Sequence, residues 1–444
     1  MKTAYVPLLL LTVSVASCTR CSPNGPAEQS SAPSPSSSAS ADAGSPGRCV
    51  LVGAPRLVGA MAGEDASASE GPVAYGAEIG GAVVDDKGFV FGLRAAGLSG
   101  AAQVLEMSLD GGSPRVLATL PTQAGGARAP LLALARDGSR LIGTLSIEDK
   151  TRVFHLARLG EGGPAPLGDV AQGKDESEAT AFGGLAGNPF VAWDDADDKP
   201  AIGRIRARLL GKTKDPKETK EAKPAKGDAA VLDEEVASPA TSDAAWPELA
   251  LSPSGDRAAL VWLSERPESE VVDGGEGEPS QAFAFRWIEA VVVDLATGAR
   301  LGSARALTPV EGHAQTFSAL WGDAGLVLAV RDDPRPTDGD GGELWAVRVP
   351  IDAAGLLGAP TRVSIADKEV APGVATLLPR PGGALVSWLG QDGSSHLSPA
   401  FTPGSATLEP ILHERRILVA RGERALASRL LGSGVELTVI RCGT

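Results

Sequence analysis

Acidic residues gather in short stretches of this sequence, and clustered carboxylates can hold a cation or, in pairs, hydrolyse a glycosidic bond. Two of these stretches supply our candidate binding residues: Asp194, Asp195, Asp197 and Asp198, and Asp332, Asp333, Asp338 and Asp340. Neither stretch completes a calcium loop. Gly342 stands where the fifth ligand position after Asp338 would be, and Lys199 and Pro200 interrupt the first stretch. The sequence therefore predicts no metal and no cofactor, with a loose calcium site as the alternative.

Motifs for nucleophilic or zinc-based hydrolysis are absent from the sequence. It contains neither the G-x-S-x-G turn of serine hydrolases nor the H-E-x-x-H pair of zinc peptidases. Its four histidines, His155, His313, His396 and His413, lie far apart without the spacing of metal ligands, and we interpret them as packed residues. No catalytic residue is predicted. The alternative is a carbohydrate-active or other hydrolytic enzyme that uses carboxylates held at a fixed separation.

The first residues, MKTAYVPLLLLTVSVASC, have the pattern of an export signal: one lysine, an apolar run and small residues before Cys18. The last four of them, 15–18, resemble the lipobox of bacterial lipoproteins. This resemblance implies removal of residues 1–17, acylation of Cys18 and a membrane anchor in the bacterial cell envelope, facing the periplasm or exposed on the outer membrane. Ordinary secretion with cleavage near Ser17 is the alternative. Residues 18–48 are rich in Ser, Pro and Ala and are predicted to form a disordered tether.

The elements that would position the candidate residues are short strands, because turn residues and apolar runs recur along residues 49–444. Stretches such as DDKGFVFGLR, SPSGDRAALVWLS and GDAGLVLAVRD each place a tight turn before an apolar run. We predict four-stranded antiparallel units, with strands A to D, at a spacing of about 40 to 65 residues. Such units stack radially as an all-β propeller, here with seven blades, although six or eight remain open. A charged insertion at about 210–236 and an acidic loop at about 264–281 interrupt the pattern.

The last unit contains only three strands before the chain ends, so its outer strand must come from elsewhere. Residues 49–59, CVLVGAPRLVG, are predicted to supply it. This pairing would bring Cys49 beside Cys442, and adjacent antiparallel strands allow a disulfide there. Two unrelated buried thiols are the alternative, but export favours the disulfide.

Two stretches also carry a family resemblance. LSPSGDRAALVW (251–262) and LARDGSRLIGTLS (134–146) resemble the strand-turn-strand signature of TolB-type propeller repeats. The resemblance implies the fold and, more loosely, a protein-binding platform, since such propellers also serve as enzyme gates and sugar sites.

On a propeller, the acidic clusters fall in the B–C loops, which share one face with the D–A loops. Three tryptophans, Trp193, Trp262 and Trp388, occupy one column of the B strands near that face. We interpret this face as the binding surface, for a protein or a cationic ligand. Acidic loops that only maintain solubility, and tryptophans that only fill the space between blades, are the alternatives. The net charge of −14 argues against nucleic acid, and we expect a monomer.

Overall fold

The computed structural model describes most of the chain from Cys49 onward, as one compact unit. The described residues are 49–59, 77–96, 101–120, 128–148, 151–174, 180–196, 203–210, 235–236, 242–266, 285–333, 341–380, 383–402, 407–408, 410–431 and 434–442. Cys18, most of the charged insertion and most of the acidic loop lie outside them. In these ranges, no helix has both the length and the apolar character needed to cross a membrane.

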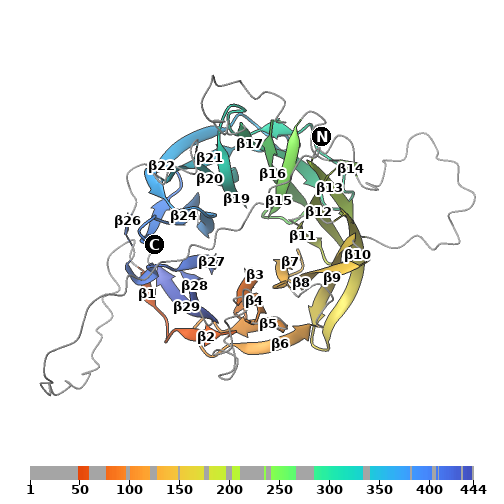
Figure 1. The fold of residues 1–444 in the computed structure, drawn as a ribbon. Coiled ribbons are helices and arrows are strands. Elements are labelled where there is room, and N and C mark those ends of the chain that lie inside the picture. The colour runs from red at the N-terminus through yellow and green to blue at the C-terminus, as the bar shows by residue number, and fades with distance from the viewer. Residues whose placement is uncertain are drawn as a thin grey trace, which may run out of the picture. The chain divides into compact units, whose positions relative to one another are not determined.

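The described strands form seven antiparallel sheets, arranged as the blades of a propeller (Figure 1). Blade 1 contains β3 (Glu78–Val84), β4 (Phe89–Arg94), β5 (Ala102–Met107) and β6 (Arg115–Leu120). Blade 2 contains β7 (Leu131–Leu134), β8 (Arg140–Glu148), β9 (Thr151–Gly160) and β10 (Gly163–Lys174). Blade 3 contains β11 (Thr180–Leu185), β12 (Asn188–Ala196), β13 (Gly203–Leu209) and β14 (Glu235–Val236).

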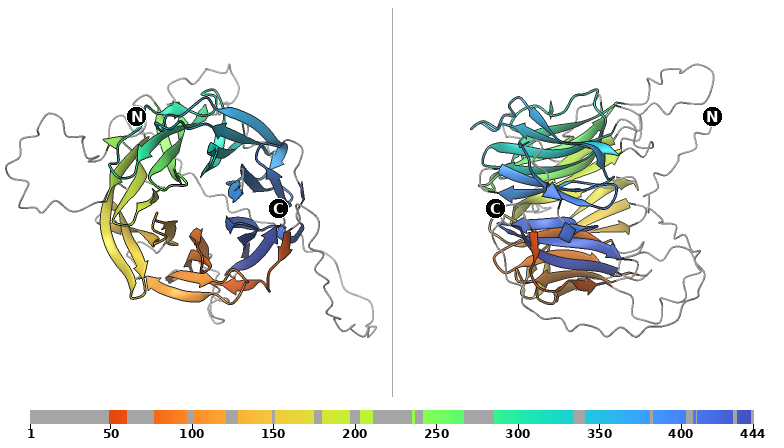
Figure 2. Two further views of the ribbon diagram at one scale, coloured as in Figure 1. Left: turned by 180° about the vertical axis from the view of Figure 1, so that it is seen from behind. Right: turned by 90° about the vertical axis from the view of Figure 1, so that its left-hand side faces the viewer.

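The second half of the ring repeats this arrangement (Figure 2). Blade 4 contains β15 (Asp243–Leu251), β16 (Arg257–Glu265), β17 (Arg286–Asp294) and β18 (Arg305–Ala306). Blade 5 contains β19 (Ala314–Gly322), β20 (Gly325–Asp332), β21 (Gly342–Val349) and β22 (Thr361–Val370). Blade 6 contains β23 (Thr376–Arg380), β24 (Gly383–Leu389), β25 (Ser395–Pro399) and β26 (Thr407–Leu408), and a 3-10 helix at Pro410–Leu412 follows it.

Blade 7 is built from both ends of the described chain. Its strands β27 (Arg416–Arg421), β28 (Arg424–Leu431) and β29 (Gly434–Cys442) are completed by β1 (Cys49–Leu51) and β2 (Arg56–Val58), which both pair with β29. Cys49 lies opposite Cys442 in the register, and a disulfide joins the two residues. The structure therefore confirms the seven-bladed fold and its closure by an N-terminal strand and a disulfide.

Apolar side chains between neighbouring blades hold the ring together. Val261 of blade 4 and Leu328 of blade 5 belong to one buried cluster, and Phe91 of blade 1 and Leu437 of blade 7 belong to another. Full burial of a side chain of this size contributes roughly 1.5–3 kcal/mol. Blades 1 and 2 approach so closely that a Cβ atom at Gly92 would lie 2.0 Å from the Pro130 carbonyl oxygen. Only glycine fits at this contact.

Candidate binding site at the centre of the ring

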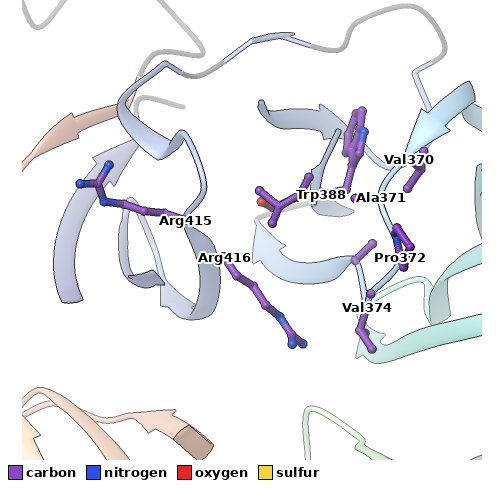
Figure 3. A pocket seen from close by; sticks show the side chains of 11 residues that line it. Val370, Ala371, Pro372, Val374, Trp388, Arg415 and Arg416 are labelled. Atoms are coloured by element: carbon purple, nitrogen blue, oxygen red, sulfur yellow. The ribbon is translucent and has the colours of Figure 1, made fainter. Parts of the chain in front are cut away.

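A small cavity lies between blades 6 and 7, beside the innermost strands (Figure 3). Its volume is about 170 Å³. One wall is the connection from β22 to β23, with Val370, Pro372 and Val374, and a second wall includes Trp388 at the end of β24. Blade 7 contributes a third side through two consecutive arginines at the start of β27, Arg415 and Arg416. The cavity therefore combines apolar walls with two guanidinium groups.

The two arginines have different surroundings. Arg415 donates to the Glu436 carboxylate at 2.6 and 3.0 Å and to the Ile411 carbonyl oxygen at 3.0 Å, so its charge is held within blade 7. The side chain of Arg416 points the other way, toward the centre of the ring (Figure 3). Among the described residues it makes no hydrogen bond or ion pair. Arg416 is therefore the cation that this site can offer to a ligand.

Glu248 supplies a carboxylate to the same central region. It lies on β15, the innermost strand of blade 4, and its Oε2 accepts a hydrogen bond from the Ala319 backbone N–H of blade 5 at 2.8 Å. Its charge and that of Arg416 interact, although the two residues form no ion pair. Because blades 4 and 7 are three places apart in the ring, this interaction spans its centre.

Neighbouring protein partly desolvates both charged groups. Burial raises the pKa of the Glu248 carboxyl to about 7, against the opposing effects of the Ala319 hydrogen bond and the Arg416 charge. Burial also lowers the pKa of the Arg416 guanidinium. Arg416 is exposed and Glu248 is half-buried, so water partly screens both charges. Displaced pKa values of this kind are typical of functional sites, because such a site exploits charges that water does not fully screen.

A local irregularity in β15 directs Glu248 to its position. The register of β15 against β16 shifts between Ala245 and Glu248, and Trp246 adopts a φ of 54°, which is strained for a bulky side chain. Pro247 lies within the shift and has no N–H to lose from the ladder. The Trp246 N–H still has an acceptor, because it donates to the Asp194 carboxylate of blade 3 at 3.2 Å. Strained backbone of this kind persists where the surroundings enforce it, and it occurs often at ligand sites.

The predicted acidic residues are bonded within the protein where the structure describes them. Asp194 is buried and supports the Trp246 backbone, and Asp195 forms an ion pair with Arg206 at 3.0 Å. Asp333 is buried against Arg331 at 2.6 Å. Asp332 is half-buried, and burial raises the pKa of its carboxyl. The remaining predicted carboxylates, Asp197, Asp198, Asp338 and Asp340, lie outside the described residues. Within the described ranges, no three His, Cys, Asp or Glu side chains are grouped so that they could hold a metal ion.

The three aligned tryptophans have different environments. Trp193 and Trp262 are 1% and 0% exposed, so both fill the space between blades and present no ring to a ligand. Trp388 lines the cavity together with Arg416, and its ring stacks on that of His396 with 5.2 Å between centroids. Sequence reasoning thus placed one cavity residue in its candidate set but missed Glu248, Arg415 and Arg416. Pro247 was an available signal, because proline inside a strand indicates a bulge.

Neither protein-family models nor curated proteins match this sequence. Among solved structures, the β-propeller domain of the Trilobed protease from Pyrococcus furiosus is 12% identical, with 83% of this chain and 96% of that chain covered and a TM-score of 0.44. The Dos1 propeller is 11% identical, with 80% and 74% covered and a TM-score of 0.40.

A structure from work on two prolyl endopeptidases is 14% identical, with a TM-score of 0.36. The match covers 80% of this chain and 54% of that one, so the chain spans about half the length of the peptidase. These similarities are too distant to support any statement about activity.

Proposed function

We propose that this protein is a lipid-anchored, extracytoplasmic binding scaffold, and that a protein partner inserts a short segment at the centre of the ring. The observation that carries the proposal is the Arg416 guanidinium, which lies beside an apolar cavity and is not bonded to any described residue. A guanidinium without a protein partner is available to a ligand, and an ion pair formed where neighbouring protein limits screening by water is stronger than one in bulk solvent. The strained backbone that directs Glu248 toward the same region supports this assignment.

The site's chemistry suits a segment with an apolar side chain next to a carboxylate. The walls formed by Pro372, Val374 and Trp388 would contact the apolar group, and the planar guanidinium of Arg416 would bind the carboxylate in bidentate fashion. The Glu248 carboxylate would bind a cationic group of the partner. This contact would account for the cationic character that we expect of the partner. A hydrolytic role for the acidic face has less support, because Asp194, Asp195 and Asp333 are bonded to protein groups.

Replacing Arg416 with alanine is expected to weaken peptide binding by about 10- to 100-fold, since a hydrogen bond to a charged group contributes roughly 1.5–3 kcal/mol. The measurement is a titration of the purified propeller with fluorescent peptides that end in an apolar residue and a free carboxylate, alongside the same peptides with an amidated terminus. Arg421→Ala is the matched control, because Arg421 ends the same strand and pairs with Asp86. Equal binding of free and amidated peptides, or equal effects of the two substitutions, would argue against this site.

Membrane attachment is tested separately. Because Cys18 completes the lipobox-like stretch, Cys18→Ser is expected to stop acylation and release the protein from membranes, or to leave the precursor unprocessed. Fractionation of cells that express each form, with mass spectrometry of the mature N-terminus, measures both outcomes. Cys21→Ser is the control and should remain membrane-bound. A processed Cys18→Ser protein that still fractionates with membranes would exclude the lipid anchor.

A further inference from the structure

Blade 2 contains a serine, a histidine and an aspartate in one continuous hydrogen-bonded chain. The Ser146 Oγ lies 2.6 Å from the His155 Nε2, and the Nδ1 of the same ring lies 2.9 Å from the Asp169 Oδ1. These are the two contacts, in the same order, that activate a serine nucleophile: one ring nitrogen takes the serine proton while a carboxylate orients the other. The arrangement is separate from the proposed binding site, which lies between blades 6 and 7.

Three neighbouring strands place these residues on one face of the sheet. His155 of β9 lies directly opposite Asp169 of β10, and Ser146 of β8 lies diagonally across, two residues beyond the partner of His155. A bulge in β10 between Pro166 and Gly168 determines this register. Because side chains alternate along a strand, pairing without the bulge would move Asp169 to the opposite face.

The opposite face of blade 2 is occupied by its hydrophobic core. Leu145 and Phe154, the neighbours of Ser146 and His155 along their strands, pack in a cluster with residues of blade 3. The three polar residues consequently point toward blade 1. The exposed fraction increases along the hydrogen-bonded series, from 7% for Ser146 to 27% for the His155 side chain and 64% for the Asp169 side chain. Solvent therefore reaches the histidine from the outside of the ring.

We propose that Ser146 is a nucleophile that can hydrolyse small carboxylic esters, with His155 as its base and Asp169 as the residue that orients the imidazole. The Ser146 Oγ would attack the ester carbonyl carbon while its proton moves to the His155 Nε2. That proton would then leave with the alcohol, producing an acyl-serine. Water would attack the acyl group, giving one proton to His155, and the acid would leave as Ser146 regains its proton. The net reaction consumes one ester and one water and yields one acid and one alcohol.

Blade 6 provides an internal comparison. The Ser394 Oγ lies 2.7 Å from the His396 Nε2, but no carboxylate in the described part of the chain is bonded to the Nδ1 of that ring. Burial lowers the pKa of the His396 imidazole, and Asp392 bonds to the Ser394 backbone instead. Ser394 is also more exposed than Ser146. A reaction governed by exposure alone would favour Ser394, whereas a reaction governed by the complete chain would favour Ser146.

The test treats the purified, exported protein with a small fluorophosphonate probe, and peptide mass spectrometry then locates the modified serine. We expect Ser146 to be labelled, and labelling to be lost in Ser146→Ala but retained in Ser394→Ala. Asp169→Asn should slow labelling at least about tenfold, as expected when the orienting carboxylate is lost. Because Asp169 is exposed, the melting temperature of this variant should stay within a few degrees of the wild type, which separates orientation from folding.

Ester hydrolysis is measured in parallel with p-nitrophenyl acetate, and the rate should fall in Ser146→Ala and Asp169→Asn alike. An unlabelled Ser146, faster labelling of Ser394, or equal labelling of the wild type and Asp169→Asn would overturn the proposal. Any of these results would identify the three residues as a structural cross-strand contact.

Discussion

Reduction of the Cys49–Cys442 disulfide is expected to lower the free energy of unfolding by several kcal/mol. The two cysteines are 393 residues apart, and the chain-entropy model gives about 6 kcal/mol as an upper limit for closing so long a loop. Little else holds the closing strand, because β1 and β2 have three residues each and Val50, Leu51 and Leu57 are exposed. Urea denaturation followed by tryptophan fluorescence, with and without a reductant, measures the change.

The expected result is a large drop in the unfolding midpoint, together with proteolytic cleavage near residues 49–59 in the reduced protein. A variant with both cysteines replaced by alanine should behave like the reduced wild type and should not respond to reductant. Cys21→Ser is the matched control and should respond like the wild type. If reduction leaves the midpoint unchanged, the noncovalent pairing of β1 and β2 would be sufficient to close the ring.

A second large effect is expected from Glu248 and should depend on pH. The pKa of this carboxyl is raised in the folded protein from 4.5 to about 7, so the folded state binds a proton more tightly than the unfolded state. Its contribution to stability is therefore fully present below pH 4.5 and is lost as pH rises through about 7. Glu248→Gln keeps an acceptor for the Ala319 N–H and removes the charge. This variant should be more stable than the wild type at pH 8, by up to about 3 kcal/mol, since each pKa unit corresponds to about 1.4 kcal/mol.

The measurement compares the free energy of unfolding of the wild type and Glu248→Gln from pH 5 to pH 8. The gain in stability from the substitution should grow as pH rises toward about 7, because Glu248 then loses its proton more readily in the unfolded state than in the folded state. Other carboxyl groups contribute equally to both proteins and cancel in the comparison. Glu161→Gln, at the exposed turn between β9 and β10, is the control and should show no such trend. A pH-independent difference for Glu248→Gln would mean that the carboxyl is not desolvated in the folded state.

The sequence was sufficient to predict the blades because the signals for them are local. Tight turns and apolar runs such as SPSGDRAALVWLS specify one hairpin at a time, and a missing fourth strand reveals where the N-terminal strand must pair. The pairing of Cys49 with Cys442 followed from that count alone, and it is the register that the structure shows.

The candidate site was harder to predict because closure of the ring brings it together. Glu248 and Arg416 are far apart in the sequence, and their charges interact only because the innermost strands of different blades face the same centre. The burial of individual side chains could not be predicted from the sequence either. Trp193 and Trp388 occupy aligned strand positions, yet neighbouring blades cover the first completely and leave the second beside a cavity. Asp194 was assigned to a surface because it lies in an acidic run, whereas its buried carboxylate supports the strained backbone of β15 in the adjacent blade.

The covalent link at Cys49 has a mechanical consequence. A pull on the chain that precedes residue 49 would act first on the disulfide, which ties the start of β1 directly to the end of β29. Without it, the same force would peel a three-residue strand from the sheet one hydrogen bond at a time, the weakest geometry for resisting tension. The bond instead distributes the load along the nine residues of β29 and into the centre of blade 7. Tension applied at the N-terminal side of the ring would therefore be resisted by a covalent bond before any strand of blade 7 separates.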